Sequence, residues 1–164
     1  MGLGAQCPER WNVYEPRVIR WRLNGPGRDA QFRSLTHLRR AVEPVAAALA
    51  AGAASPEQRI RIMELSRELR RLGESGDLEE FLDVDIGFHS LILEASGNEM
   101  FAALRQVIAE VLSGRTYQGL MPRVPQEHAL QSHEGAAASI RAGDAESAQR
   151  HMTELLADVR SAIM

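Results

Sequence analysis

The chain has 164 residues, of which 45% are hydrophobic and 25% are charged, and its formal net charge is -3 at pH 7. A chain of this length folds as one domain by default and can bury most of its apolar surface. The acidic balance excludes a strong electrostatic attraction to nucleic acid, because modules that neutralise phosphates are normally basic on one face.

The N-terminal part is predicted to hold a tail followed by a short helix. Residues 1–14 contain Gly, Cys and Pro without periodicity, which is typical of a tail or a linker remnant. The helix has Pro16 near its first turn and ends at residues 24–27, Asn-Gly-Pro-Gly. Its apolar residues are Val18, Ile19, Trp21 and Leu23.

A long helix is predicted from Asp29 to about Ala53, because apolar side chains recur there at steps of three and four residues. Pro44 removes one backbone hydrogen bond within it, so we expect a bend or two helices that meet at this point. The expected buried face consists of Phe32, Leu35, Leu38, Val42, Val45, Ala46 and Leu49.

Five more helices are predicted in the remaining sequence. Ser55 and Gln58 form a capping box that begins a helix ending near residue 72, and Asp77 begins one that stops at residues 96–98, Ser-Gly-Asn. Glu99 to Val111 is the next, and residues 113–125 are predicted to be a loop. The last two helices cover residues 126–141 and 144–164. With no competing strand pattern, the sequence indicates an all-α, antiparallel bundle of about six to seven helices.

Cysteine content and hydropathy predict the compartment. Cys7 is the only cysteine, so an internal disulfide bond is impossible and a reducing environment fits. No apolar run approaches the roughly 20 residues that span a bilayer, and the start lacks the pattern of a secretory signal. We therefore predict a cytoplasmic protein with no membrane partner.

Asp85 and His89 are one helical turn apart, so their side chains share a face with Phe81, Phe88 and Ile92. A carboxylate and an imidazole in an apolar stripe are costly unless a metal, a ligand or an internal hydrogen bond compensates them. The spacing by itself favours a hydrogen-bonded Asp–His pair over a metal site.

His128, His133 and His151 on the last two helices bear on this choice. A bundle can bring such residues to one interior point, and three nitrogens with one carboxylate suit zinc or a similar divalent ion. His128 and His133 are five residues apart and point to different faces. His133 is the better candidate, because it precedes the apolar stripe of its helix.

Arg39 and Glu43 are also one turn apart, and this spacing favours an exposed salt bridge worth a few tenths of a kcal/mol. A buried arginine facing a cavity would instead bind a carboxylate with its planar guanidinium group. The sequence has no Gly-rich phosphate loop, Ser-His-Asp arrangement, His-Glu-x-x-His motif or cysteine cluster. We therefore predict that the chain is not an enzyme.

Several short stretches of the sequence form a recognisable set in their order and separations. They are Trp11-Asn12, Val18–Trp21, Leu38–Pro44, Asp85–His89, Ser96–Asn98, His133-Glu134 and Ala142–Asp144. Together they resemble the ligand-binding (FadR C-terminal-like, FCD) domain of bacterial transcription regulators of the GntR family, FadR subfamily. The resemblance covers nearly the whole chain and implies a helical effector-binding domain over residues 15–164, with a central ligand cavity. The first stretch resembles members that respond to sugar acids.

Members of this family often hold a divalent metal through an Asp-x-x-x-His pair and two further histidines, and the metal helps to bind a small carboxylate. By position, Asp85, His89 and His133 match three ligands, which implies a zinc or nickel site. The fourth would stand 22 residues after His133, where Leu155 stands instead. His151 lies one turn earlier and substitutes only if its helix shifts or rotates. Three protein ligands with water or effector in the open position are also workable.

Arg39 matches a residue that commonly meets the carboxylate of the effector. The implied effector site therefore comprises Arg39, Asp85, His89 and His133, to which we add Tyr117 from the expected loop. The implied partners are a small carboxylate, such as a sugar acid, and a second copy of the chain. Family members also carry a winged helix-turn-helix before this domain. Nothing in this chain corresponds to it, so operator DNA is expected to bind only through a domain absent from this chain.

Two alternatives stay open at this point. One is a small helical metal-dependent hydrolase that uses Asp85, His89 and His133, although no carboxylate with convincing spacing offers the base that hydrolysis needs. The other is a structural dimerisation bundle without a pocket. A cavity lined by Arg39 and His89 would argue against the latter.

Overall fold

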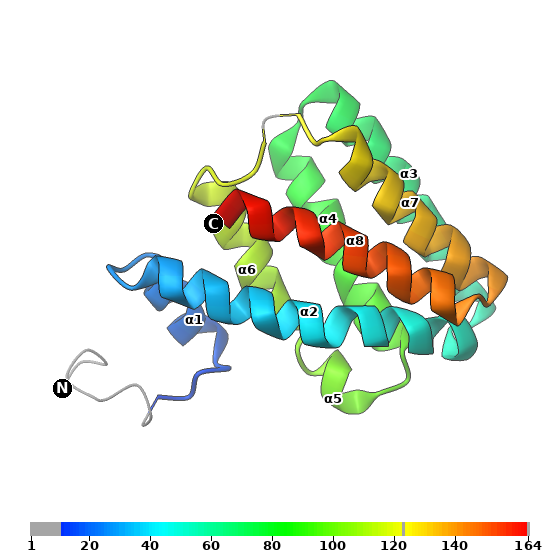
Figure 1. The fold of residues 1–164 in the computed structure, drawn as a ribbon, viewed down its shortest axis with the longest axis horizontal. Helices are drawn as coiled ribbons and strands as arrows, with labels where there is room; N and C mark the ends of the chain where they lie inside the picture. The colour runs from blue at the N-terminus through cyan, green and yellow to red at the C-terminus, as the bar shows by residue number, and fades with distance from the viewer. Residues whose placement is uncertain (1–10, 123, 164) are drawn as a thin grey trace.

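The computed structural model describes residues 11–122 and 124–163, and for residues 158–163 it describes the backbone alone. Within these ranges the chain forms eight α-helices and no strand, which confirms the all-α prediction and adds one helix to the expected number (Figure 1). Most of the expected N-terminal tail lies outside the described residues. The helices are α1 (Pro16–Leu23), α2 (Arg28–Ala53), α3 (Pro56–Ser75), α4 (Leu78–Ala95), α5 (Glu99–Ala102), α6 (Arg105–Tyr117), α7 (Glu127–Ala142) and α8 (Ala145–Ile163).

Local signals define the ends of several helices. The Ser55 hydroxyl accepts a hydrogen bond from the backbone N–H of Gln58, whose side chain accepts one from the N–H of Ser55, so the predicted capping box is confirmed. Gly76 and Gly143 end α3 and α7 with φ angles of 78° and 75°, a region that favours glycine. The two-residue connections there make α3 and α4, and α7 and α8, antiparallel neighbours.

The long helices surround a common interior (Figure 1). α2 packs along α8, α8 along α7, α7 along α3, and α3 along α4, which in turn contacts α2. α6 packs on α4, and α1 packs on both α6 and α2. Two buried apolar clusters result, a larger one among α2, α3, α4, α6, α7 and α8, and a smaller one that joins α1, α6 and the start of α2. This arrangement packs α4 against α2, α3 and α6.

Small residues form the buried face of the second half of α2. Ala46, Ala47 and Ala50 are fully buried, whereas Val45 and Leu49 are 40% and 42% exposed. The prediction that Val45 and Leu49 belong to the buried face was therefore wrong. Alanine lets α8 pack closely on α2 over this stretch, and the larger residues lie outside the contact.

Two further predictions about the first helices need correction. Trp21, expected in the apolar set of α1, is 45% exposed and packs edge-to-face on Trp11 instead. Pro44 is buried within α2, which continues through it as a single helix, so the alternative of two helices is excluded. Among the described residues, no helix combines the length and apolarity needed to cross a membrane.

The predicted helix from Glu99 to Val111 is interrupted. The Asn98 side chain accepts hydrogen bonds from two backbone N–H groups of α5, which ends after one turn, and α6 begins only at Arg105. The break lets Phe101 pack on the larger apolar cluster and Leu104 on the smaller one. α6 then extends to Tyr117, where a loop was predicted, and its Gly114 lies against Leu23 of α1 and Phe32 of α2.

Candidate metal and anion site

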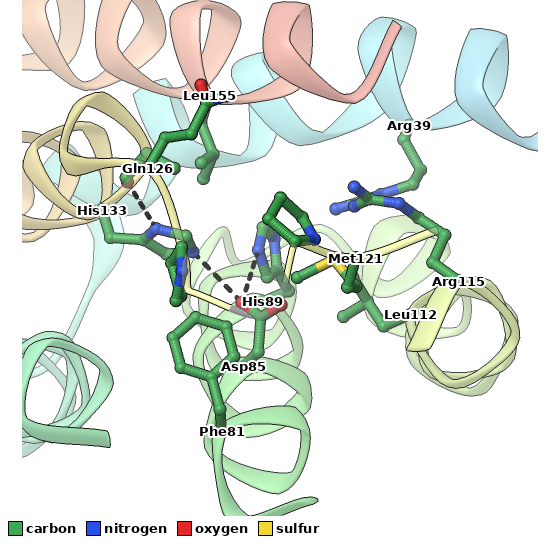
Figure 2. Close-up of a pocket in the computed structure, with 13 residues that line it drawn as sticks. Arg39, Phe81, Asp85, His89, Leu112, Arg115, Met121, Gln126, His133 and Leu155 are labelled. Atoms are coloured by element: carbon green, nitrogen blue, oxygen red, sulfur yellow. Dashed lines mark hydrogen bonds and ion pairs between the residues drawn. The ribbon is translucent and has the colours of Figure 1, made fainter. Parts of the chain in front are cut away.

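A cavity of about 220 Å³ lies in the interior of the bundle (Figure 2). Its charged and ionisable lining residues are Arg39 of α2, Asp85 and His89 of α4, Arg115 of α6 and His133 of α7. A cavity below the roughly 300–1,000 Å³ of pockets for drug-sized ligands suits a small metabolite. The rest of the wall is mostly apolar and consists of Phe81, Leu112, Met121, Pro122, Pro125, Gln126, Ala129 and Leu155.

Asp85, His89 and His133 converge on one point of this cavity, as the sequence predicted. Oδ1 of Asp85 lies 3.2 Å from Nε2 of His89 and 3.1 Å from Nε2 of His133 (Figure 2). All three side chains are buried, and each offers one ligand atom within 4.8 Å of the other two. One carboxylate oxygen therefore faces two imidazole nitrogens.

The hydrogen bond at Nδ1 of His133 determines which partners its Nε2 can bind. Nδ1 lies 2.7 Å from the carbonyl oxygen of Ala129, one turn earlier in α7. A carbonyl oxygen only accepts hydrogen bonds, so this contact assigns the proton to Nδ1. In the neutral ring, Nε2 then directs a lone pair toward the carboxylate of Asp85. Such a contact needs either a second proton or a cation between the two atoms.

His89 shows the same pattern with a carboxylate in place of the carbonyl group. Its Nδ1 forms a hydrogen bond with Oε1 of Glu43, and its Nε2 faces Asp85. Burial alone would raise the pKa of Glu43, but the charges of Arg39 and His89 outweigh it and hold that pKa at about 2. Because Glu43 is ionised, it accepts the Nδ1 proton of His89.

The neighbouring carboxylates favour positive charge in this part of the site. Burial alone would lower the pKa of His89, but Glu43 and Asp85 raise it to about 9. Burial would likewise raise the pKa of Asp85, but its contacts with His89 and His133 hold it well below its usual range. The group therefore attracts either protons or a cation to the space between the imidazoles and Asp85.

This donor set fits a divalent metal. One ion at that point would take Nε2 of His89, Nε2 of His133 and an oxygen of Asp85, and both Nδ1 protons would keep their acceptors. Metal-binding histidines usually donate the other ring N–H to a carboxylate or a backbone carbonyl group, as both imidazoles do here. Two imidazole nitrogens and one carboxylate suit zinc or nickel and leave a coordination position open.

Arg39 and Glu43 form a buried ion pair, which corrects the predicted exposed salt bridge. Nε of Arg39 lies 2.6 Å from Oε2 of Glu43, and the two side chains are 2% and 1% exposed. Packing of α4 and α8 on α2 removes both from water. The Nη1 atom of Arg39 has no hydrogen-bond partner, although it is buried and its residue lines the cavity. Arg39 therefore keeps a free donor for a ligand.

Arg115 is a pocket residue that sequence reasoning missed. It is 7% exposed, and its Nε atom has no hydrogen-bond partner. Burial, with a smaller contribution from the charge of Arg39, lowers the pKa of Arg115 to about 10, so it remains a cation at neutral pH. Its helical spacing from the buried Ile108 and Leu112 could have placed it on the inner face of α6.

Tyr117 and His151 lie away from the cavity. Tyr117 is 72% exposed and borders a separate surface hollow between α1 and α6, so the structure does not bring it to the other predicted effector residues. His151 packs against Gly135 of α7, while Leu155, one turn later, lines the cavity. Leu155 thus occupies the place of the expected fourth ligand as an apolar wall.

The pocket offers little for hydrolysis. Among its lining residues in the described part of the chain, Asp85 is the only carboxylate, and it faces both imidazoles. Glu43 is the next carboxylate in this group, but Arg39 and His89 occupy its oxygens. Neither carboxylate is placed to activate a water as a separate general base.

The cavity also argues against the alternative of a structural bundle without a pocket, because Arg39 and His89 both line it.

Residues 34–158 match the family described as the FCD domain, and the chain belongs to this family. It is 25% identical over 151 residues to the galactonate operon transcriptional repressor of Escherichia coli (strain K12), a match that covers 90% of this chain and 64% of the repressor. Its fold is similar to that of GntR from Streptococcus agalactiae, with a TM-score of 0.70, 23% identity, and coverage of 85% of this chain and 62% of that chain.

These similarities confirm the resemblance noted in the sequence. The chain spans less than two thirds of the length of either relative. The Escherichia coli relative is named as a transcriptional repressor, and the Streptococcus agalactiae protein carries the family name GntR.

Proposed function

We propose that this chain is the effector-binding domain of a GntR-type transcription regulator, and that its pocket binds a small carboxylate together with a divalent metal ion. The observation that carries the proposal is the pair of imidazoles whose Nε2 atoms face Asp85 while their Nδ1 atoms face an acceptor. A bound metal supplies an attachment point for a carboxylate oxygen. In this proposal Asp85, His89 and His133 hold the ion.

Arg39 is proposed to bind the carboxylate of the effector. Its guanidinium group is held in place by Glu43, and the free Nη1 donor remains for a ligand. Charge-assisted hydrogen bonds between arginine and carboxylate are the strong ones. Because a relative of this chain is the repressor of a galactonate operon, sugar acids are the first effectors to test.

Regulation is proposed to couple the pocket to DNA through a dimer in the cytoplasm. Effector binding would change how two subunits present separate DNA-binding domains to the operator, which is a coupling between distinct sites. The net charge of -3 supports assigning DNA contact to a domain other than this one.

A thermal-shift screen tests the proposed function. Sugar acids are added to the purified chain with zinc, with nickel or with a chelator. A ligand at 100 times its Kd stabilises a folded domain by about 2.7 kcal/mol, which raises the Tm by roughly 5–10 °C. We expect such a shift for at least one acid in the presence of metal and its loss with the chelator. If no acid raises the Tm under any metal condition, the proposal is wrong.

The chain is expected to form a homodimer through helix faces. Val45 and Leu49 of α2 and Met100 of α5 are exposed apolar residues, and Leu49 and Met100 border the same surface hollow. Burying such residues in a contact between copies removes apolar area from water. Multi-angle light scattering at micromolar concentration is expected to give twice the mass of the chain, 18.1 kDa. A monomer at that concentration would contradict the dimer.

Leu155→His is expected to tighten zinc binding by roughly tenfold or more, because it adds an imidazole at the wall of a site with three protein ligands. Leu155→Phe is the matched control, since it adds a ring without a ligand nitrogen. Competition with a chromogenic chelator measures both affinities. Equal zinc affinity for the two variants would show that residue 155 does not face the metal.

A further inference from the structure

The pocket is lined by two arginines, and only one of them forms an ion pair. Glu43 forms an ion pair with Arg39, but no carboxylate forms one with Arg115 among the residues that the structure describes. An unpaired buried charge is costly, so a buried cation is normally paired with an anion. The charge of Asp85 favours the protonated form of Arg115, but the two side chains form no ion pair, so Arg115 keeps its donors for an anion from a ligand.

The two guanidinium groups also lie near one another. Figure 2 shows Arg39 and Arg115 reaching into the pocket from α2 and α6, on the side away from His133. Their charges are close enough for Arg39 to disfavour the protonated form of Arg115. Each also has a buried nitrogen without a hydrogen-bond partner, Nη1 of Arg39 and Nε of Arg115. Two like charges with free donors at one place form a receptor for an anion.

The charges of the pocket indicate how many negative charges a ligand brings. Arg39 and Arg115 are balanced by Glu43 and Asp85, and the imidazoles are neutral when they bind a metal. A divalent ion then leaves two uncompensated positive charges inside the bundle. A ligand with one carboxylate neutralises half of this excess, whereas a dianion neutralises all of it.

We infer that the effector is a small acid with two anionic groups, one at the metal and the second between the guanidinium groups of Arg39 and Arg115. This inference rests on the proposed function and narrows it, because a sugar acid with a single carboxylate would leave one end without a counter-charge. A carboxylate and a phosphate both match the arginine fork, so either can be the second group.

Calorimetry on the zinc-loaded chain with two matched ligand pairs tests this inference. Galactarate differs from galactonate only in a second carboxylate, and 6-phosphogluconate differs from gluconate only in a phosphate. At least one of galactarate and 6-phosphogluconate, which carry two anionic groups each, is expected to bind about tenfold or more tightly than its partner. The pair that shows the difference identifies the second group.

Arg115→Gln should remove most of this preference, because it lowers the affinity for galactarate or 6-phosphogluconate more than that for galactonate or gluconate, and Arg115→Lys should retain part of the preference. Thermal unfolding controls for folding of both variants, and the wild-type ligand pairs test the inference without any variant.

Equal affinity within both pairs would overturn the inference, as would an equal loss of affinity for both members of a pair in Arg115→Gln. If only galactonate or gluconate binds, the inference fails and the proposed function stands; if none of the four acids binds, both lose their support.

Discussion

His89→Ala is expected to lower the affinity of the chain for zinc by about 100-fold or more and to abolish the metal-dependent part of effector binding. His89 is the side chain that links α2 to the proposed metal, because Nδ1 contacts Glu43 and Nε2 faces Asp85. Removing a group that only orients a metal ligand already lowers metal affinity by roughly 10–100-fold, so we expect the loss of a ligand to lower it at least as much. Since metal and effector binding are linked, a weaker metal site lowers the affinity for the effector as well.

His151→Ala is the control for this experiment, because His151 is a histidine on α8 that lies outside the cavity. It should leave the zinc affinity within about threefold of the wild type, since it removes no ligand of the proposed site. Calorimetry with zinc, and then with an acid in the presence of zinc, measures both effects. Effector affinity that is the same in His89→Ala and the wild type would disprove the shared site.

Glu43→Ala is expected to lower the free energy of unfolding by about 3–5 kcal/mol, which is the usual cost of removing one partner of a buried ion pair. Glu43 is 1% exposed and contacts both Arg39 and His89, so its loss leaves two buried groups without their acceptor. For a chain of this size the Tm should fall by roughly 6–20 °C. Urea unfolding followed by circular dichroism measures the change in free energy directly.

Glu74→Ala is the matched control, because Glu74 is 66% exposed and pairs with Arg70 at the same spacing of four residues. Exposed pairs of this kind contribute a few tenths of a kcal/mol, so the variant should unfold almost like the wild type. The comparison separates burial from sequence spacing, which is identical for the two pairs. Equal stability of the two variants would show that Glu43 is not the buried acceptor of the site.

The helices were predictable where local chemistry decides their ends. The capping box at Ser55 and the glycine at position 143 gave boundaries within a few residues of those in the structure. The region of α5 and α6 was not predictable in this way, because its helices depend on contacts with α1, α2 and α4. A glycine suits position 114 of α6 because Leu23 and Phe32 pack closely against it, and the local sequence does not show this contact.

The candidate metal residues were predictable for a different reason. Asp85 and His89 share a helix face by spacing alone. The apolar stripe that follows His133 favoured it over His128, and the family resemblance pointed to the same residue. The roles of Arg39 and Glu43 could not be deduced from spacing, because the same separation occurs in exposed salt bridges such as that of Arg70 and Glu74. Burial by α4 and α8 distinguishes the two cases.

Arg115 and Tyr117 show the limit of sequence reasoning about the pocket. They are two residues apart in a segment that was predicted to be a loop, and Tyr117 was assigned to the effector site as a residue of that loop. Once α6 continues through this segment, residues two apart point in different directions. Arg115 faces the interior, and Tyr117 faces the solvent.

Anomalous diffraction above and below the zinc absorption edge, from crystals of the chain grown with zinc, is the most direct test of the central claim that Asp85, His89 and His133 hold one metal ion. We expect one peak in the cavity, about 2.0–2.2 Å from the Nε2 atoms of both histidines and an oxygen of Asp85. Zinc found only at surface histidines such as His151, with no peak between Asp85 and the two imidazoles, would contradict the claim.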